Sequence, residues 1–106
     1  TMRDVDERGM RTVMEEAIKR ASTGTVGIHV SFDADGMDPD YAPGVGTPSL
    51  GGLSYREAHL AMEMLADTGK VISAEFVEVN PALDHQNGTA KLAVGLLASL
   101  LGKKIL

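Results

Sequence analysis

The spacing of apolar residues predicts an N-terminal helix from about residue 5 to residue 21. Asp4 and Glu7 are three residues apart, which is typical of a capping box at the start of a helix. Ser22-Thr23-Gly24 then ends the segment. The apolar residues that recur at helical intervals are Met10, Val13, Met14, Ala17, Ile18 and Ala21.

Alternation of side chains predicts two strands, at residues 26–33 and 71–79. In an extended chain successive side chains point to opposite faces. One face of the first strand carries Val26, Ile28, Val30 and Phe32, and the other carries Gly27, His29, Ser31 and Asp33. We expect Glu75, in the middle of the second strand, to be a partly buried acid with a partner.

Two further helices are predicted. The first of these, which is the second helix of the chain, begins with the capping box of Ser54 and Glu57 and ends at Thr68-Gly69. His59 is expected on its outer side, exposed to solvent. The last helix, residues 89–101, is apolar around most of its circumference, so we expect it to be buried on more than one side.

The order α-β-α-β-α predicts an α/β fold with a right-handed βαβ unit and a parallel pair of strands. Parallel sheets are normally covered on both faces and are larger than two strands. Residues 1–106 are therefore interpreted as a single, incomplete domain, part of a three-layer αβα parallel sheet. The rest of the sheet would come from a missing part or another chain, and the absence of an initiator Met before Thr1 agrees with a processed chain or a piece of a longer one.

Composition narrows the classes of partner. Fifteen acidic and ten scattered basic residues give a net charge of −5, so no nucleic-acid partner is expected. The chain has no cysteine, which excludes disulfides and thiolate metal sites. No apolar run approaches the roughly 20 residues that span a bilayer, and no leader precedes the first helix, so no membrane partner is expected and a cytoplasmic location is predicted.

The candidate chemistry lies where the strands end. Asp33 and Asp35 are two residues apart at the end of the first strand, and Glu78 ends the second. Ligands of parallel sheets gather outside the carboxyl ends of the strands, so these carboxylates are expected to converge. A carboxylate cluster indicates a hard cation such as Mn²⁺ or Mg²⁺. His29 is expected to be hydrogen-bonded rather than a metal ligand, and His85 to be solvated.

Residues 34–53 form a long loop rich in Gly and Pro, which we interpret as an active-site wall. An EF-hand is excluded because its fifth, sixth and twelfth positions, counted from Asp33, hold Met37, Asp38 and Gly44. A phosphate-binding loop is excluded because the segment 44–47 lacks the Gly-Lys-Ser/Thr sequence.

Four segments together resemble the C-terminal part of the arginases, in the ureohydrolase family, and of the bacillus-type bacterial enzymes in particular. They are Ser31-Phe32-Asp33-Ala34-Asp35-Gly36-Met37-Asp38-Pro39, Ala42-Pro43-Gly44-Val45-Gly46-Thr47-Pro48, Gly51-Gly52-Leu53-Ser54-Tyr55-Arg56-Glu57 and Glu78-Val79-Asn80-Pro81. The Asp-x-Asp-x-x-Asp-Pro element is shared with agmatinases, whereas Glu-Val-Asn-Pro is typical of arginases.

The resemblance implies an arginase/deacetylase-like fold and a binuclear Mn²⁺ centre that activates a bridging hydroxide. The hydroxide attacks the guanidinium carbon of L-arginine and releases urea and L-ornithine. By the same resemblance Asp33 and Asp35 are manganese ligands, with Asp33 as a bridge. Glu78 receives the substrate guanidinium and Thr47 lies near the substrate. The family also implies a homo-oligomer, a trimer or a hexamer.

The chain departs from the family in one respect. Arginases carry a first block of ligands in Gly-Asp-x-His and Asp-Ala-His-x-Asp contexts, and neither is present here. The histidine that assists proton transfer is expected in the missing N-terminal part, so no catalytic residue is assigned in this chain. Two alternatives stay open: a catalytically inactive fragment that self-associates through its last helix, and an agmatinase-type ureohydrolase.

Overall fold

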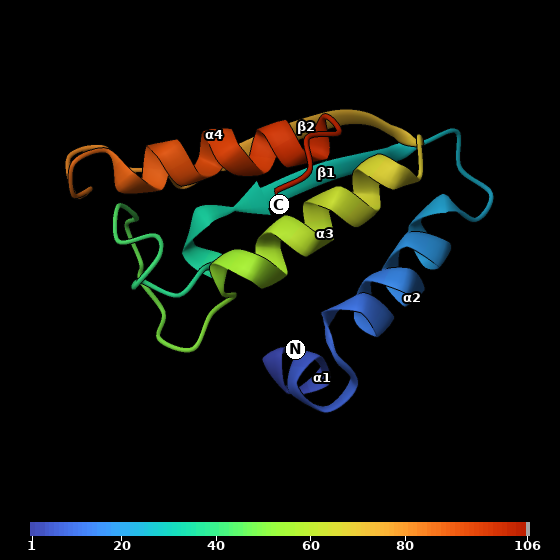
Figure 1. Ribbon diagram of the computed structural model, residues 1–106, viewed down its shortest axis with the longest axis horizontal. Coiled ribbons are helices and arrows are strands. Elements are labelled where there is room, and N and C mark those ends of the chain that lie inside the picture. The colour runs from blue at the N-terminus through green and yellow to red at the C-terminus, as the bar shows by residue number, and fades with distance from the viewer. Residues whose placement is uncertain (106) are drawn as a thin grey trace.

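The computed structural model describes residues 1–105, and the elements follow the predicted alternation of helices and strands (Figure 1). The α/β class is confirmed. The helices and strands within these residues are α1 (Met2–Arg8), α2 (Met10–Ser22), β1 (Ile28–Asp33), the 3₁₀ turn η1 (Ala34–Gly36), α3 (Tyr55–Asp67), β2 (Val71–Val77) and α4 (Gly88–Leu100).

The N-terminal segment is two helices, so the prediction of one helix over residues 5–21 was wrong. Gly9 separates α1 from α2 with φ 79° and ψ 147°, a backbone conformation that glycine adopts readily. The capping box also lies further upstream than predicted. The Thr1 hydroxyl accepts a hydrogen bond from the Asp4 backbone N–H, at 3.3 Å, so Asp4 is the third residue of the helix rather than its cap.

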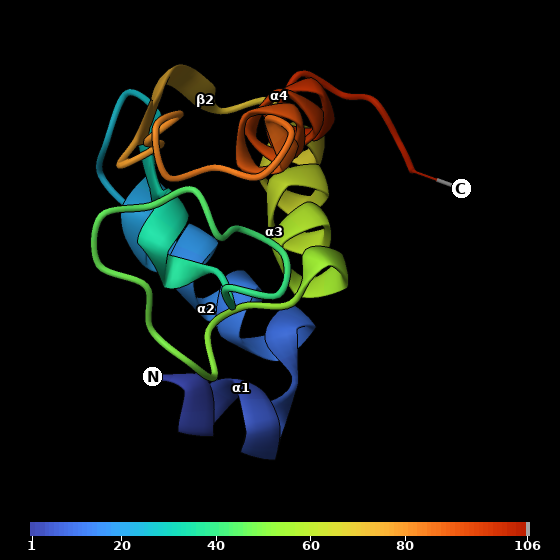
Figure 2. The ribbon, with the colours of Figure 1, turned by 90° about the vertical axis from the view of Figure 1, so that its left-hand side faces the viewer.

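The sheet consists of β1 and β2 in parallel, with Phe32 opposite Phe76 and Asp33 opposite Val77. Helices α3 and α4 lie on one face of it (Figure 2), where Ile28 and Val30 are buried. The first strand begins two residues later than predicted, and Val26 is fully exposed rather than inward-facing. The core lies between this face and the helices, and contains Ile28, Val30, Met37, Ala42, Ala58, Met62, Leu65, Leu92, Leu96 and Leu100.

The opposite face of the sheet is polar. His29 Nδ1 lies 2.8 Å from the Ser73 hydroxyl, and the Ser31 hydroxyl donates to a Glu75 carboxylate oxygen at 3.0 Å. The Glu75 side chain is 55% exposed, so the prediction that it would be partly buried was wrong, although it has the expected partner. His29 is hydrogen-bonded, as predicted.

Helix α3 begins as predicted. The Ser54 hydroxyl accepts from the Glu57 backbone N–H at 3.3 Å, and the Glu57 carboxylate accepts from the Ser54 backbone N–H at 2.8 Å. The helix ends at Asp67, before Thr68 and a left-handed Gly69. These two signals set the bounds of the helix in the crossover connection between β1 and β2, the kind of connection that parallel strands require.

Helix α4 is buried on only one side within residues 1–105. Leu92, Leu96 and Leu100 face the core, whereas Val94 is 68% exposed and Leu101 is 80% exposed. The prediction of burial on more than one side was therefore wrong for the part of the chain that the structure describes.

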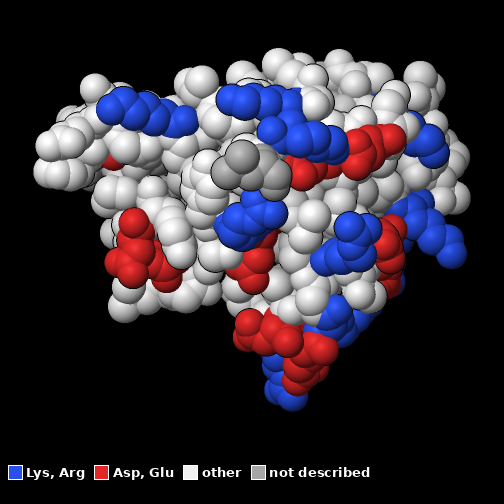
Figure 3. Space-filling view, viewed as in Figure 1, with Lys and Arg blue, Asp and Glu red and all other residues white. Residues whose placement is uncertain are grey.

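Charged side chains are mixed on the surface. On the face drawn in Figure 3, groups of Lys and Arg lie next to groups of Asp and Glu, and no large area carries a single sign of charge. Within residues 1–105, no helix combines the length and the apolar character that a membrane crossing requires.

His59 is buried between α3 and α4, so the prediction that it would face solvent was wrong. Its side chain is 1% exposed, its Nδ1 lies 2.9 Å from the Ser99 hydroxyl, and its ring packs against Tyr55. The ring also lies against Gly95 of α4, where a Cβ would be 3.6 Å away, an ordinary contact distance. The pattern of apolar residues along α3 could not predict this burial, because the hydrogen-bond partner of His59 lies on another helix.

The burial of His59 predicts a pH-dependent stability. Desolvation lowers the pKa of His59; the charge of Glu63 opposes this shift, whereas those of Arg56 and Lys103 add to it. The unfolded chain therefore binds a proton more readily than the folded one, and stability is expected to fall as pH decreases below about 6.5, the usual histidine pKa. Thermal unfolding between pH 7.5 and pH 5 measures this slope.

The His59→Gln variant is expected to flatten that slope, because glutamine can still bond Ser99 but does not titrate. His29→Gln is the matched control, since the His29 side chain is 54% exposed and lies outside the core. Equal slopes in the unmodified protein and in His59→Gln would contradict the assignment.

Candidate metal and substrate site

Three carboxylates meet at the carboxyl edge of the sheet. β1 ends at Asp33, and the Asp33 carboxylate accepts a hydrogen bond from the Asp35 backbone N–H at 3.0 Å, which opens the turn η1. Because Asp33 is opposite Val77 in the parallel register, Glu78 is the next residue beyond the paired strands. Asp33 and Asp35 therefore lie together at this edge, and Glu78 follows the end of the neighbouring strand, near enough for its charge to act on Asp33.

The electrostatics of this edge confirm that the acids influence one another. A side-chain hydrogen bond with Asp35 raises the pKa of Asp33, and burial and the charges of Asp35 and Glu78 raise it further, against the lowering effect of the Asp35 backbone N–H. The hydrogen bond from the Thr47 hydroxyl lowers the pKa of Asp35, and a side-chain hydrogen bond with Asp33 lowers it further. Clustered carboxylates of this kind repel one another unless they share a proton or a cation.

The two carboxylate oxygens of Asp35 have different surroundings. One oxygen, Oδ2, accepts a hydrogen bond from the Thr47 hydroxyl. The other, Oδ1, is buried and has no hydrogen-bond partner among residues 1–105. Buried polar atoms are nearly always satisfied, so this oxygen is suited to a ligand that would bind at the site. Thr47, predicted near a substrate, thus contacts the Asp35 side chain directly.

Glu78 has an unusual backbone. Its φ is 64°, in the left-handed region that non-glycine residues rarely adopt. Its carboxylate faces the loop, since a Cβ at Gly46 would lie 3.8 Å from Glu78 Oε2. Such outliers persist where the surrounding structure holds them, and they are frequent at functional sites.

The loop of residues 34–53 is folded back on itself. Met37 and Leu53 form an isolated β-bridge, and the Asp38 carboxylate accepts hydrogen bonds from the backbone N–H groups of Asp40, at 3.0 Å, and Gly51, at 2.8 Å. These bonds lower the pKa of Asp38. Asp38 therefore fixes the shape of the loop, in contrast to Asp35 with its unpaired oxygen.

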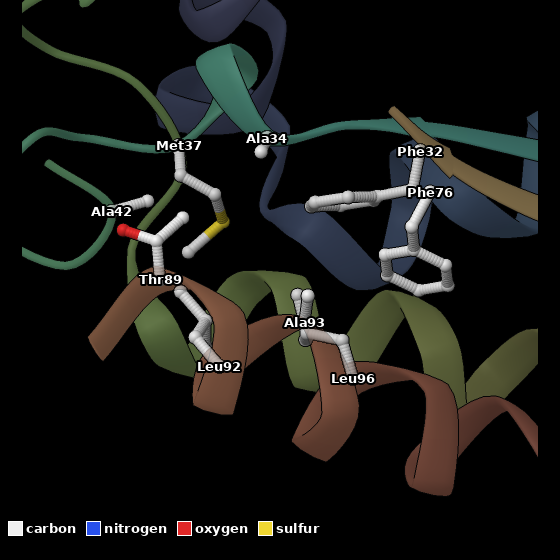
Figure 4. A pocket seen from close by; sticks show the side chains of 9 residues that line it. All are labelled: Phe32, Ala34, Met37, Ala42, Phe76, Thr89, Leu92, Ala93 and Leu96. Carbon is white, nitrogen blue, oxygen red and sulfur yellow. The ribbon is translucent and has the colours of Figure 1, made fainter. Parts of the chain in front are cut away.

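A small apolar pocket lies under the loop (Figure 4). Its lining combines the Phe32 and Phe76 rings with Met37, Leu92 and the hydroxyl-bearing Thr89, and its volume is about 10 Å³. That is about the room of one water molecule. The pocket is too small and too apolar for a substrate such as an amino acid.

The described residues do not by themselves form a complete metal site. Within residues 1–105, no group of three or more His, Cys, Asp or Glu side chains is arranged to hold a metal ion. The histidines are engaged or remote from the acids: His29 bonds Ser73, His59 bonds Ser99, and His85 is exposed in the turn before α4, as predicted.

Comparison with known proteins identifies the family. A family model described as Arginase matches residues 1–102. The chain belongs to the arginase family. An arginase from Brevibacillus brevis is 57% identical over all 106 residues. The crystal structure of an arginase from Bacillus subtilis superposes with a TM-score of 0.95 at 60% identity, over all of this chain and 39% of that one.

The chain spans about a third of the arginases that it matches, 36% of the protein from Brevibacillus brevis. The chain also superposes on less similar structures. One is an Entamoeba histolytica arginase in complex with L-ornithine, with a TM-score of 0.88 at 34% identity. An agmatine ureohydrolase from Thermoplasma volcanium superposes with a TM-score of 0.81 at 32% identity. In these two comparisons the chain covers 34% and 32% of the other protein.

Four residues around the site of this arginase-family chain make contacts that the sequence analysis did not predict. They are Gly44, Asn80, Asp84 and Thr89, which connect the loop to the segment between β2 and α4. Asp84 precedes the helix by four residues, and an acid near a helix start is a recognisable capping signal. The contacts with Gly44 join residues about 40 positions apart, which local patterns do not reveal.

Proposed function

We propose that the complete protein, with the part of the arginase length that this chain does not span, hydrolyses the guanidinium group of L-arginine to L-ornithine and urea with Mn²⁺. The observation that carries this proposal is the meeting of Asp33, Asp35 and Glu78 at one edge of the sheet in a chain 57% identical to an arginase.

The residues at this edge fit a hard divalent cation. Carboxylate oxygens are the ligands that Mn²⁺ prefers, and the unpaired Asp35 Oδ1 offers one directly. Asp33 and Asp35 would hold the metal from this chain, with the remaining ligands outside it. A bound binuclear Mn²⁺ centre would supply the reaction with hydroxide at neutral pH, by lowering the pKa of water.

Glu78 would bind and orient the substrate. A carboxylate pairs with a planar guanidinium through two parallel hydrogen bonds, which fix both position and angle. The left-handed backbone of Glu78 turns the chain at the strand end, and its carboxylate faces Gly46 in the loop. Thr47 would act through Asp35, because its hydroxyl bonds that carboxylate and restricts its rotation.

L-Arginine is preferred to agmatine as substrate. The chain is 57% identical to an arginase but 32% identical to the superposed agmatine ureohydrolase. The Glu-Val-Asn-Pro segment at residues 78–81 is typical of arginases. A homo-oligomeric state remains a prediction from the resemblance to the family, and a cytoplasmic location remains a prediction from the sequence.

The proposal is tested with the complete protein, stripped of metal and reloaded with Mn²⁺. Urea release is then measured from L-arginine and from agmatine at equal concentrations. We expect Mn²⁺-dependent urea release with L-arginine as the better substrate. A preference for agmatine would replace the substrate assignment, and no urea from either compound would overturn the proposed reaction.

A second candidate concerns the 106-residue chain alone, which would be an inactive, self-associating fragment. Exposed apolar side chains on β2, on α4 and just after α4 favour it: Ile72 is 67% exposed, Val94 68% and Leu101 80%. Exposed apolar side chains and open strand edges promote association.

We therefore expect the isolated chain to exceed its monomer mass of 11.2 kDa in light scattering during gel filtration. The double variant Val94→Glu/Leu101→Lys is expected to shift the mass toward the monomer, because it places charge on the exposed side of α4. A monomer at 100 µM for the unmodified chain would contradict association.

A further inference from the structure

Gly44 is the point where the site loop meets two other segments. Its backbone N–H donates to the Thr89 hydroxyl on α4, at 2.8 Å, in a buried hydrogen bond. Its carbonyl accepts from the backbone N–H of Asn80, at 2.7 Å, just beyond Glu78. The loop, the exit of β2 and the start of α4 are therefore joined through one residue.

The Asp84 carboxylate accepts hydrogen bonds from the first turn of α4, although Asp84 lies four residues before the helix. Its Oδ1 accepts from the backbone N–H groups of His85, at 2.9 Å, and Thr89, at 3.0 Å, and its Oδ2 accepts from Ala90 at 3.2 Å. Asn87, which directly precedes the helix, has a left-handed backbone and makes no side-chain capping bond. The first turn of α4, including Thr89, thus depends on the Asp84 carboxylate.

Asp84 also touches the loop directly. A Cβ at position 44 would lie 2.5 Å from both Cβ and Cγ of Asp84, so only glycine fits there. The loop backbone consequently packs against the Asp84 side chain. Figure 4 places Thr89 beside Ala42, on the loop side of α4, which is consistent with this contact.

We propose that Asp84 is a positioning residue for the substrate. It holds the first turn of α4, and through Thr89 and Gly44 it sets the loop against Asn80. Thr47 lies three residues beyond Gly44, and Glu78 lies two residues before Asn80. The hydrogen bond between Gly44 and Asn80 therefore sets the position of Glu78 relative to Asp35 and Thr47. The inference rests on the proposed function, in which Glu78 binds the guanidinium group.

The test uses the complete, Mn²⁺-loaded protein and the variants Asp84→Ala and Asp84→Asn. We expect the KM for L-arginine to rise about 10-fold or more in Asp84→Ala, the range typical of supporting residues, with Mn²⁺ content retained. Asp84→Asn is expected to give a smaller rise, because asparagine keeps one capping oxygen. Ser99→Ala is the control: it removes a different polar contact of α4, remote from the loop, and is expected to leave KM unchanged.

Amide hydrogen exchange of segments 42–48 and 78–81 gives a readout independent of turnover. Exchange in both segments is expected to accelerate in Asp84→Ala and not in Ser99→Ala. An unchanged KM in Asp84→Ala, or equal exchange in the two variants, would overturn the positioning role. Failure of the unmodified protein to release urea would overturn the proposed function instead, and the exchange comparison would still decide whether Asp84 fixes the two segments.

Discussion

Replacing Asp35 by asparagine in the complete protein is expected to lower Mn²⁺ affinity and urea release together, each by on the order of 100-fold or more. Loss of a residue that merely supports a ligand typically costs 10- to 100-fold, so loss of the ligand should cost at least as much. Asparagine keeps the size of the side chain and an oxygen for the Thr47 hydroxyl, but removes the negative charge. Metal analysis after dialysis, with a urea assay at saturating Mn²⁺, measures both effects.

Asp40→Asn is the matched control for that experiment. Asp40 is an exposed acid of the same loop, and its backbone N–H bonds Asp38 whichever side chain it carries. The control is expected to keep both metal and activity. Unchanged metal content and turnover in Asp35→Asn would refute the ligand role of Asp35.

The second large effect is expected at Glu78. Glu78→Ala should lower kcat/KM for L-arginine by about 100-fold or more, since it removes two charge-assisted hydrogen bonds to the guanidinium group. Mn²⁺ should stay bound, because Asp33 and Asp35 are unchanged. Steady-state kinetics and metal analysis of the same preparation separate the two properties.

Glu78→Gln tests the charge without removing the side chain. It retains the side-chain length, so its kcat/KM is expected to lie between those of Glu78→Ala and the unmodified protein. Loss of Mn²⁺ in both variants would overturn the assignment of Glu78 to the substrate and would place it among the metal ligands.

Patterns in the local sequence were sufficient to predict the helix and the strands that position the site. The capping box at Ser54 and the closing Gly69 delimit α3, and alternation across Ile28 and Val30 reveals which side of β1 is buried. Once two parallel strands are recognised, their carboxyl ends must meet at one edge, and Asp33 and Glu78 follow from that geometry alone.

What the sequence did not predict depends on contacts between distant residues. His59 is a polar residue on a helix, and only its pairing with Ser99, forty residues away, explains its burial. Gly9 is a single glycine inside a helical pattern, which leaves open whether the helix continues or breaks. The hydrogen bond from Gly44 to Thr89 likewise could not be predicted, because it depends on how α4 packs against the loop.

The most direct test of the account is a crystal structure of the complete protein with Mn²⁺, measured at the manganese absorption edge. Anomalous scattering locates the metal independently of any assumption about its ligands. We predict manganese peaks within bonding distance of the carboxylate oxygens of Asp33 and Asp35, with Glu78 outside the metal's coordination. Manganese bound elsewhere, with both aspartates free of it, would contradict the central claim that this chain carries part of an arginase metal centre.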